Sequence, residues 1–182
     1  HNALNAAGVL GVVRVLGLDV TAAAQGLSSY SGVRRRFDLI GEAGGVTVVD
    51  DYAHHPTEIA ATTAAAAALG YRRVVVLFQP HRYSRTQSLA AEFGSAFDAV
   101  DEVVLMDVYA AGEAPIEGVS GQTIADALAA HDGAPAVTYG ENRDEVLGCV
   151  LSKVGEGDLL ITMGAGDVTL FAPRAVEALR SR

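Results

Sequence analysis

Residues 73–79, RVVVLFQ, give the clearest indication of the fold class. Two later segments share their almost wholly apolar character, EVVLMD at 102–107 and DLLITM at 158–163. Strands of this kind are typical of a parallel sheet that is covered by helices on both faces, because neither face meets water. Segments with a helical pattern lie between them. The sequence therefore predicts a doubly wound α/β fold with a mostly parallel sheet.

The alternation of strands and helices runs through most of the chain. We expect strands at 36–41, 45–50, 73–79, 102–107, 135–138 and 158–163, and helices at 56–69, 84–98, 120–131, 141–154 and 168–180. RFDLIGEAGGVTVVD has the pattern of a hairpin, which allows an antiparallel edge. Two short helices precede this region, and the polar connector SSYSGVRRRF follows them. We therefore expect a boundary near Gly32, with 1–32 and 33–182 as separate parts.

Composition limits the classes of function. The chain has 182 residues and a formal net charge of −9, which argues against nonspecific binding to nucleic acid or to an acidic membrane surface. The single Cys149 excludes an internal disulfide and fits a reducing compartment. No apolar run approaches the ~20 residues of a membrane helix, and no signal segment opens the chain. These features predict a cytoplasmic protein.

Polar residues gather where the predicted strands end. DDYAHHPTE follows one strand, QPHRYSR the next, DVYAAGE the third and GAGD the last. In an open α/β sheet, ligands bind in the crevice at the carboxyl ends of the strands, where such loops converge. The sequence therefore predicts a binding or catalytic site built from these four loops.

Arginines in these loops point to an anionic ligand. Arg82 and Arg85 are three residues apart, so both guanidinium groups share one face if Ser84 begins a helix. Together they are suited to bind a carboxylate or a phosphate, and the start of a helix also favours an anion. The alternative is a pair of surface arginines near a helix cap. Arg72 and Arg73 are expected to be solvent-exposed residues at the start of a strand.

Other motifs are weak or absent. Pro56 and Glu58 suit the first turn of a helix, and no pattern supplies the three or four ligands of a zinc site, so no metal is expected to be bound by this chain alone. The amides of GAGDVT are placed to cradle an anion, but Thr169 stands where a dinucleotide fingerprint has its third glycine. Neither GxxxxGK[ST] nor GxSxG occurs.

Six segments in this order, HNALNA, RRRFDLIGE, DDYAHHPTE, FQPHRYSRT, DVYAAGE and GAGD, closely resemble the Mur ligases. Within the family they favour the branch that adds L-alanine to UDP-N-acetylmuramate in peptidoglycan synthesis. The resemblance implies a carboxyl-terminal, Rossmann-like, amino-acid-binding domain, preceded by the last helices of a central ATPase domain. Because HNALNAAGVLGVVRVLGL opens in the middle of a helical pattern, without a methionine, we expect a fragment of a longer polypeptide.

The resemblance also implies roles for individual residues. Tyr52, His54 and His81 would line the amino-acid pocket with Gly164 and Gly166. Arg82 and Arg85 would neutralise the alanine carboxylate and the phosphoryl group. On the nucleotide side, Asp51 would bind the ATP ribose, Asn2 and Asn5 would face the adenine and ribose, and Arg36 would reach the phosphates. Arg36, His54, Arg82 and Arg85 would be the catalytic set. Facing arginines suit this reaction, because negative charge builds on phosphoryl oxygens and on the tetrahedral intermediate.

The whole enzyme would use ATP and magnesium, but the phosphate loop and the magnesium ligands are absent from this sequence. We therefore expect the chain alone to be inactive, and to depend on the missing domains of the same polypeptide. Two alternatives stay open at this point. One is the family's murein tripeptide recycling ligase, and the other is a free-standing α/β module that binds a small anion.

Overall fold

The computed structural model describes residues 2–30 and 33–181. The chain divides into two compact units, His1–Val33 and Arg34–Arg182. This division falls beside the boundary that the sequence predicts near Gly32, a residue that itself lies outside the described part. The first unit is helical and the second is α/β.

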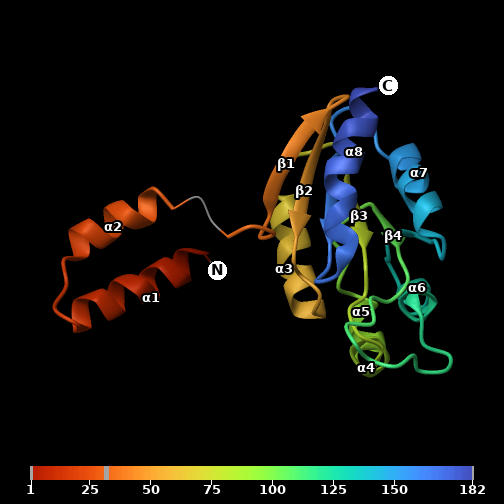
Figure 1. The fold of residues 1–182 in the computed structure, drawn as a ribbon, viewed down its shortest axis with the longest axis horizontal. Coiled ribbons are helices and arrows are strands. Elements are labelled where there is room, and N and C mark those ends of the chain that lie inside the picture. The colour runs from red at the N-terminus through yellow and green to blue at the C-terminus, as the bar shows by residue number, and fades with distance from the viewer. Residues whose placement is uncertain (1, 31–32, 182) are drawn as a thin grey trace. The chain divides into compact units, whose positions relative to one another are not determined.

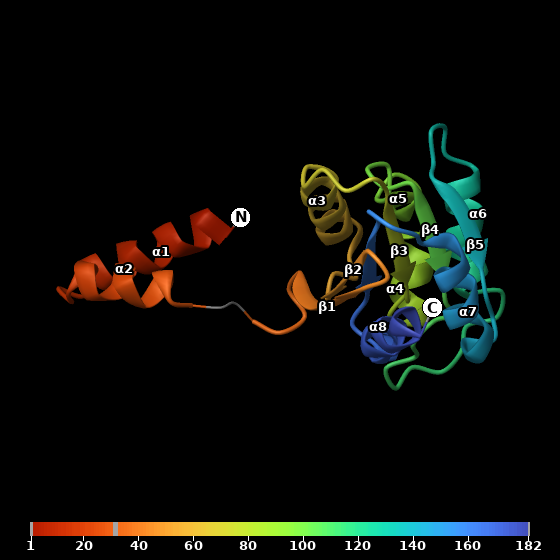
Figure 2. The ribbon, with the colours of Figure 1, turned by 90° about the horizontal axis from the view of Figure 1, so that it is seen from above.

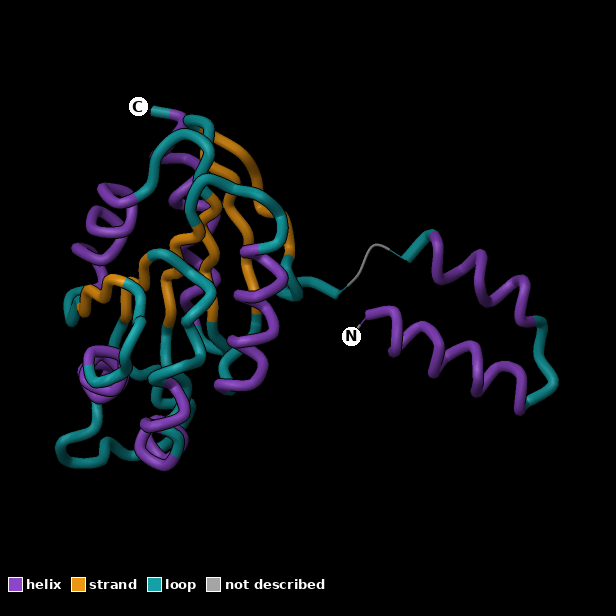
Figure 3. Tube along the Cα trace, turned by 180° about the vertical axis from the view of Figure 1, so that it is seen from behind, coloured by secondary structure: helices purple, strands orange, loops and turns teal. Residues whose placement is uncertain are grey.

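The first unit is a pair of helices, α1 (Asn2–Val15) and α2 (Val20–Ser28), joined by a short turn (Figures 1 and 3). Asp19 begins α2, because its carboxylate accepts hydrogen bonds from the amides two and three residues further on. Leu4 and Val15 expose 77% and 87% of their surface. The unit therefore leaves much of its apolar surface outside its own core. Among the described residues, no helix is long and apolar enough to cross a membrane.

Within residues 33–181, the second unit forms a six-stranded sheet (Figure 1). The strands are β1 (Asp38–Ala43), β2 (Val46–Asp51), β3 (Val74–Phe78), β4 (Glu102–Leu105), β5 (Ala136–Tyr139) and β6 (Leu159–Met163). Their order in space is β1-β2-β6-β3-β4-β5. β1 runs antiparallel to β2, and the remaining neighbours are parallel. The predicted mostly parallel sheet with an antiparallel edge is confirmed.

Helices cover both faces of this sheet. They are α3 (Pro56–Ala67), α4 (Tyr83–Ser88), α5 (Ala90–Phe93), α6 (Gly121–Ala129), α7 (Arg143–Lys153) and α8 (Phe171–Arg180), with a 3₁₀ turn η1 (Asp167–Leu170) before α8. Figure 2 shows α3, α5 and α6 on one face and α7 and α8 on the other. Successive residues of β3 point to opposite faces of the sheet and pack in two hydrophobic cores, one on each face. Val76 and Phe78 belong to the first core, and Val75 and Leu77 belong to the second. The fold is therefore doubly wound, as the sequence predicts.

A buried carboxylate with two arginine partners links the amino ends of β3 and β6. The Asp158 side chain is fully buried, and its two oxygens accept hydrogen bonds from Nε and Nη2 of Arg72, each at 3.0 Å. Arg73 and the Gly155 amide also donate to it at 3.0 Å. Burial alone would raise the pKa of Asp158, but these hydrogen bonds outweigh it and the pKa is lowered. The expectation that Arg72 and Arg73 are merely solvated is therefore wrong, because a buried carboxylate requires their charge.

Two differences from the predicted elements affect the site. The strand predicted at 36–41 begins only at Asp38, because Arg35 and Phe37 have positive φ angles of 62° and 52°, which a strand does not accommodate. The helix predicted at 84–98 is instead two short helices, α4 and α5, which break at Leu89, where φ is −111° and ψ is 14°. Both corrections alter the loops at the carboxyl edge of the sheet.

Candidate functional site

The polar segments that follow β2, β6, β3 and β4 meet at one edge of the sheet. The parallel register aligns Asp51 of β2 with Met163 of β6, Met163 with Phe78 of β3, and Phe78 with Leu105 of β4. The loops after these strands therefore begin at the same level. This is the convergence that the sequence predicts for a binding crevice.

Aromatic rings from three of these loops form a row, which we call the ring row: Tyr52, His54, His81 and Tyr109. The Tyr52 and His54 rings meet edge to face with centroids 5.4 Å apart, and His54 lies 5.6 Å from His81. His81 stacks on Tyr109 at 5.7 Å, with 15° between the ring planes. Three of these residues are predicted site residues. Tyr109 was not singled out, although it lies in the DVYAAGE loop.

The start of α3 fixes the first half of the ring row. His55 is the N-cap of α3, Pro56 is its first residue, and Glu58 accepts hydrogen bonds from the amides of His54 and His55 at 3.2 and 3.3 Å. Nδ1 of His54 lies 3.0 Å from the Tyr52 carbonyl oxygen. Burial would raise the pKa of Glu58, but the His54 amide and nearby positive charge outweigh it and the pKa is lowered. The predicted helix start is confirmed, and it orients His54.

Arg82 and Arg85 lie beside the other half of the ring row, in an arrangement that differs from the predicted one. α4 begins at Tyr83, so Arg82 is the residue before the helix, with a φ of 73°, and the two arginines do not share a helix face. Nη1 of Arg85 lies 3.2 Å from both the carbonyl oxygen and Nδ1 of His81. Within the described ranges, neither arginine forms an ion pair with a carboxylate. Their charge therefore remains available to a ligand.

Burial and the neighbouring positive charges both favour the neutral form of His81. Burial lowers the pKa of His81, and the positive charges of Arg85, His54 and Arg82 lower it further. The ring is therefore neutral at neutral pH. Because a guanidinium can only donate, Nδ1 of His81 accepts from Arg85 and the neutral ring carries its proton on Nε2.

Arg35 is a central residue of this edge that the sequence did not distinguish from its neighbours. Its guanidinium lies 4.9 Å from the centroid of the Tyr52 ring, and its Nε lies 3.1 Å from Asp50. Its Nη2 donates to the carbonyl oxygens of Gly164 at 2.6 Å and Gly166 at 3.2 Å. Arg35 therefore ties the ends of β2 and β6 together beneath the ring row.

Arg36, which the resemblance assigns to the phosphates, is more open. Its side chain is 55% exposed, and its guanidinium lies 5.7 Å from the Tyr52 ring and 4.0 Å from the Glu58 carboxylate. A contact of this length at the surface is weak, so Arg36 can still bind a ligand. Asn5 is exposed on α1 in the first unit, and the Asn2 side chain lies outside the described part of the chain.

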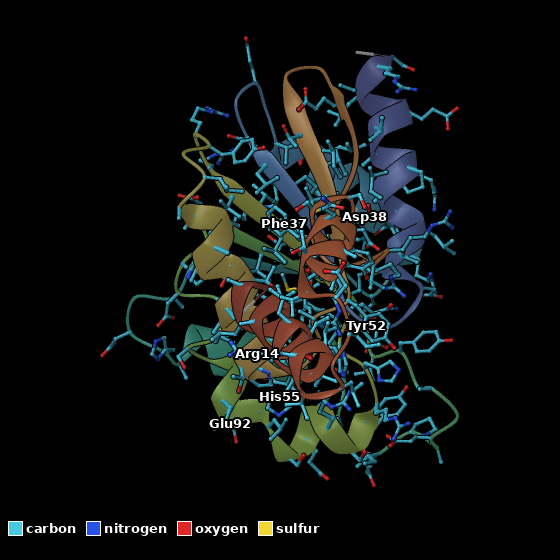
Figure 4. All side chains as sticks on the ribbon, turned by 90° about the vertical axis from the view of Figure 1, so that its left-hand side faces the viewer. Arg14, Phe37, Asp38, Tyr52, His55 and Glu92 are labelled. Carbon is cyan, nitrogen blue, oxygen red and sulfur yellow. The ribbon has the colours of Figure 1, made fainter. Side chains whose placement is uncertain are left out.

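Asp51 does not have the free carboxylate that ribose binding would need. It is 4% exposed, its Oδ1 accepts the amide of Ala53 at 2.7 Å, and its Oδ2 accepts the amide of Phe37 at 2.8 Å. Burial raises the pKa of Asp51, which these two amides only partly offset. Asp51 therefore joins the segment before β1 to the segment after β2, and Figure 4 labels one residue of each, Phe37 and Tyr52. Both oxygens of Asp51 are therefore engaged by the backbone of these loops, and neither is free to accept a ribose hydroxyl.

Gly164 and Gly166 serve close packing more than anion binding. The Gly164 amide donates to the carbonyl oxygen at the end of β2 at 3.0 Å, and the Val168 amide donates to Oε1 of Gln79 at 3.0 Å. A Cβ on Gly166 would lie 2.4 Å from the Gln79 side chain and 2.7 Å from the Tyr109 ring. The expected anion cradle therefore has two of its amides already engaged, and the missing side chain of Gly166 lets Tyr109 approach the segment after β6.

A pocket of about 300 Å³ opens beside Tyr109, toward α7. It is lined by Gln79, Met106, Asp107, Val108, Tyr109, Ala110, Glu141, Arg143 and Asp167. Asp167 accepts hydrogen bonds from Arg143 at 2.5 Å and from Gln79 at 2.8 Å. Burial would raise the pKa of Asp167, but these donors outweigh it and the pKa is lowered. Sequence reasoning missed Gln79 and Arg143, because neither lies in a recognisable spacing.

Metal binding has no obvious centre in this arrangement. In residues 2–30 and 33–181, no three histidine, cysteine, aspartate or glutamate side chains gather where they could hold a metal ion. The carboxylates of the site edge are instead engaged by arginines and backbone amides.

Relatives with known names match the whole chain. UDP-N-acetylmuramate--L-alanine ligases are 49% identical over 186 residues in Mycolicibacterium vanbaalenii and 46% identical over 181 residues in Myxococcus xanthus. In both cases the match covers 100% of this chain and 38% of the relative. The chain thus spans less than two fifths of the length of these relatives.

Solved structures agree with this result. The UDP-N-acetylmuramate-alanine ligase of Thermotoga maritima is 30% identical with a TM-score of 0.80, and the match covers 100% of this chain and 38% of that one. A murein peptide ligase from Psychrobacter arcticus shares the fold, with 23% identity, a TM-score of 0.75, and coverage of 98% and 36%. The family described as Mur ligase, glutamate ligase domain, matches residues 35–166. The chain therefore belongs to the Mur ligase family, through its glutamate ligase domain.

Proposed function

We propose that this chain is the carboxyl-terminal part of an ATP-dependent ligase that joins L-alanine to UDP-N-acetylmuramate in peptidoglycan synthesis. The observation that carries the proposal is the name shared by curated relatives that are 45–50% identical over the full length of the chain. The arrangement of the carboxyl edge supports it, since aromatic and basic side chains converge there.

The amino acid would bind between the ring row and the two arginines. The alanine carboxylate requires positive charge that is not already neutralised, and Arg82 and Arg85 supply it beside His81. Tyr52 and His54 close the other side of the row. A methyl side chain leaves little to recognise, so the rings would select mainly by limiting size.

The reaction would proceed through an acyl phosphate of the UDP-N-acetylmuramate carboxylate. The alanine amine attacks the acyl carbon, the C–N bond forms, inorganic phosphate leaves with the electron pair of the C–O bond, and the proton that the nitrogen loses passes to the departing phosphate. Negative charge grows on the carbonyl and phosphoryl oxygens during this step. Arg36, Arg82 and Arg85 would stabilise that charge, and His54 lies among them in the ring row.

The nucleotide would be bound only in part by this chain. We assign Asn2 and Asn5 to the adenine and ribose side, and Arg36 to the phosphates. Asp51 is given no direct contact with ribose, because both of its oxygens already accept backbone amides. Magnesium is assigned no residue here, since the described carboxylates do not gather into a ligand set. The phosphate loop and metal site would belong to the rest of the polypeptide.

The murein peptide ligase alternative rests on fold alone. The Psychrobacter arcticus enzyme is 23% identical, whereas the named alanine ligases reach 50%. A free-standing anion-binding module is less favoured, because the relatives are more than twice as long as the chain. The alternatives differ from the proposal in the substrate that they predict: the murein peptide ligase would use a tripeptide, and the free-standing module would form no amide.

The test is amide formation by the full-length enzyme with UDP-N-acetylmuramate, ATP and alanine. We expect Arg85→Ala to lower kcat/KM for alanine at least ~10-fold, about 1.4 kcal/mol, with the KM for ATP and the thermal midpoint nearly unchanged. Arg180→Ala, in the last turn of α8, is the matched control. A wild-type enzyme that accepts a tripeptide but not alanine, or equal kinetics in the two variants, would contradict the proposal.

A further inference from the structure

The loop after β4 forms hydrogen bonds with the segment that carries Arg82 and Arg85. The Tyr109 amide donates to the Pro80 carbonyl oxygen, and the Arg82 amide donates to the Tyr109 carbonyl oxygen, each at 2.8 Å. Further along the same loop, the Glu113 carboxylate accepts hydrogen bonds from Ser84, at 3.0 Å from its amide and 2.6 Å from its hydroxyl. The segment 80–84 is therefore held from outside at several successive points.

Arg82 depends on this support because of its backbone. Its φ of 73° and ψ of 134° lie outside the regions that residues with a Cβ normally occupy. Such a conformation persists only when its surroundings fix it. Tyr109 fixes the Arg82 amide and Glu113 fixes the amide of Ser84, so the direction of the Arg82 side chain is set by the loop.

Glu113 also replaces a missing helix cap. No side chain at the Arg82 position bonds to the first turn of α4, and α4 has only six residues, too few to be stable alone. Glu113 accepts the amide of Ser84 in that first turn. Arg85, which contacts His81, lies one residue further along the same short helix. A change at Glu113 should therefore reach both arginines.

We propose that Glu113 is a positioning residue, which sets Arg82 and Arg85 for the amino-acid carboxylate by binding the Ser84 amide and hydroxyl. This inference rests on the proposed function, since it assumes that the arginines bind alanine. A carboxylate suits the task because it presents an acceptor to each donor. The two hydrogen bonds from Ser84 lower the pKa of Glu113, so the residue stays ionised and the contact persists at neutral pH.

The experiment measures the KM for alanine, the KM for ATP and the thermal midpoint in the full-length ligase. We expect Glu113→Ala to raise the KM for alanine ~10-fold, with the KM for ATP and the midpoint nearly unchanged. Glu113→Gln, which keeps one acceptor, should be intermediate. Ser84→Ala should raise the same KM by a smaller factor, and it serves as the second variant if Glu113→Ala does not fold. Glu117→Ala, an exposed carboxylate in the same loop, is the matched control.

A double variant separates positioning from a general loss of structure. If Glu113 acts through Ser84, the Glu113→Ala and Ser84→Ala double variant should raise the KM for alanine no more than Glu113→Ala alone. A fall in the thermal midpoint with an unchanged KM for alanine would overturn the inference, and so would multiplicative effects. If Arg85→Ala impairs alanine use and Glu113→Ala does not, the inference fails while the proposed function stands. If the wild-type enzyme does not use alanine, both fail.

Discussion

Arginines lie at both edges of the parallel sheet, and they do different work at each. At the amino edge, Arg72 and Arg73 bind Asp158, whose side chain is fully buried. At the carboxyl edge, Arg85 contacts the neutral ring of His81, and Arg36 lies 4.0 Å from a carboxylate at the surface. Arg72 and Arg73 share a buried counter-charge, whereas Arg36 has only a weak surface contact with a carboxylate and Arg85 pairs with none in the described residues.

The difference shows how structural and functional arginines separate in this protein. A guanidinium that binds a buried carboxylate has little left to offer a substrate, and its removal leaves that carboxylate unpaired. A guanidinium beside rings and backbone carbonyls keeps its charge for an anion. Arg35 belongs to the first kind although it lies at the carboxyl edge, because it binds Asp50 and two carbonyl oxygens. The pairing, and not the edge, therefore decides the role.

The largest effect should come from the amino edge. Asp158→Ala leaves two guanidiniums and a backbone amide without their acceptor, which we expect to cost about 3 kcal/mol of unfolding free energy. For a chain of this size the thermal midpoint would fall by roughly 6–12 °C. Thermal unfolding of the chain measures this, with the exposed Asp132→Ala as control. A normal midpoint, or a KM for alanine that rises in the full-length variant, would break the comparison.

The elements of the fold were largely predictable because each has a clear pattern. The strands around Val75, Val104 and Ile161 are continuous apolar runs, and Pro56 with Glu58 marked the start of α3. The break at Leu89 was not predictable, since the same apolar spacing suits one helix or two short ones. The spacing of apolar residues shows which face of a helix is buried, but it does not show where the helix is interrupted.

The site was predictable as a region and less so in its contacts. Tyr52, His54, His81 and Arg85 converge as expected. Arg35 was missed because three successive arginines look alike in sequence, whereas in the structure this one has a φ of 62° and its guanidinium binds Asp50. The residue type alone does not show in which direction the backbone turns a side chain, so a role that depends on this direction cannot be predicted from the sequence.

A smaller effect should come from Asp51, which lies at the site edge but is bound as Asp158 is. Asp51→Asn replaces one acceptor oxygen with an NH₂ group that faces a backbone amide, so we expect a loss of about 1–2 kcal/mol. The thermal midpoint would fall by roughly 2–8 °C, with little change in the KM for ATP. Thermal unfolding and ATP kinetics of the full-length variant measure both. A normal midpoint with a raised KM for ATP would instead make Asp51 a nucleotide ligand.

The smallest effect is a pH dependence that reports the unpaired charge around His81. Burial and the positive charges of Arg85, His54 and Arg82 hold its pKa below the ordinary 6.5, while Glu113 acts weakly in the opposite direction. Between the lowered folded value and 6.5, the unfolded chain binds a proton that the folded chain does not. The stability that His81 contributes is therefore complete above this window and declines as the pH falls through it.

Thermal midpoints of the wild type and of His81→Gln, compared at about pH 7.5 and about pH 5.5, measure this contribution. The wild type should lose more stability on acidification than His81→Gln, because only the wild type has a ring that resists protonation when folded. Arg85→Ala removes one of the positive neighbours, so it should raise the pKa of His81 and narrow the difference. If acidification affects all three proteins equally, the charge at the carboxyl edge is already neutralised by the solvent or the fold, and the contrast between the two edges is lost.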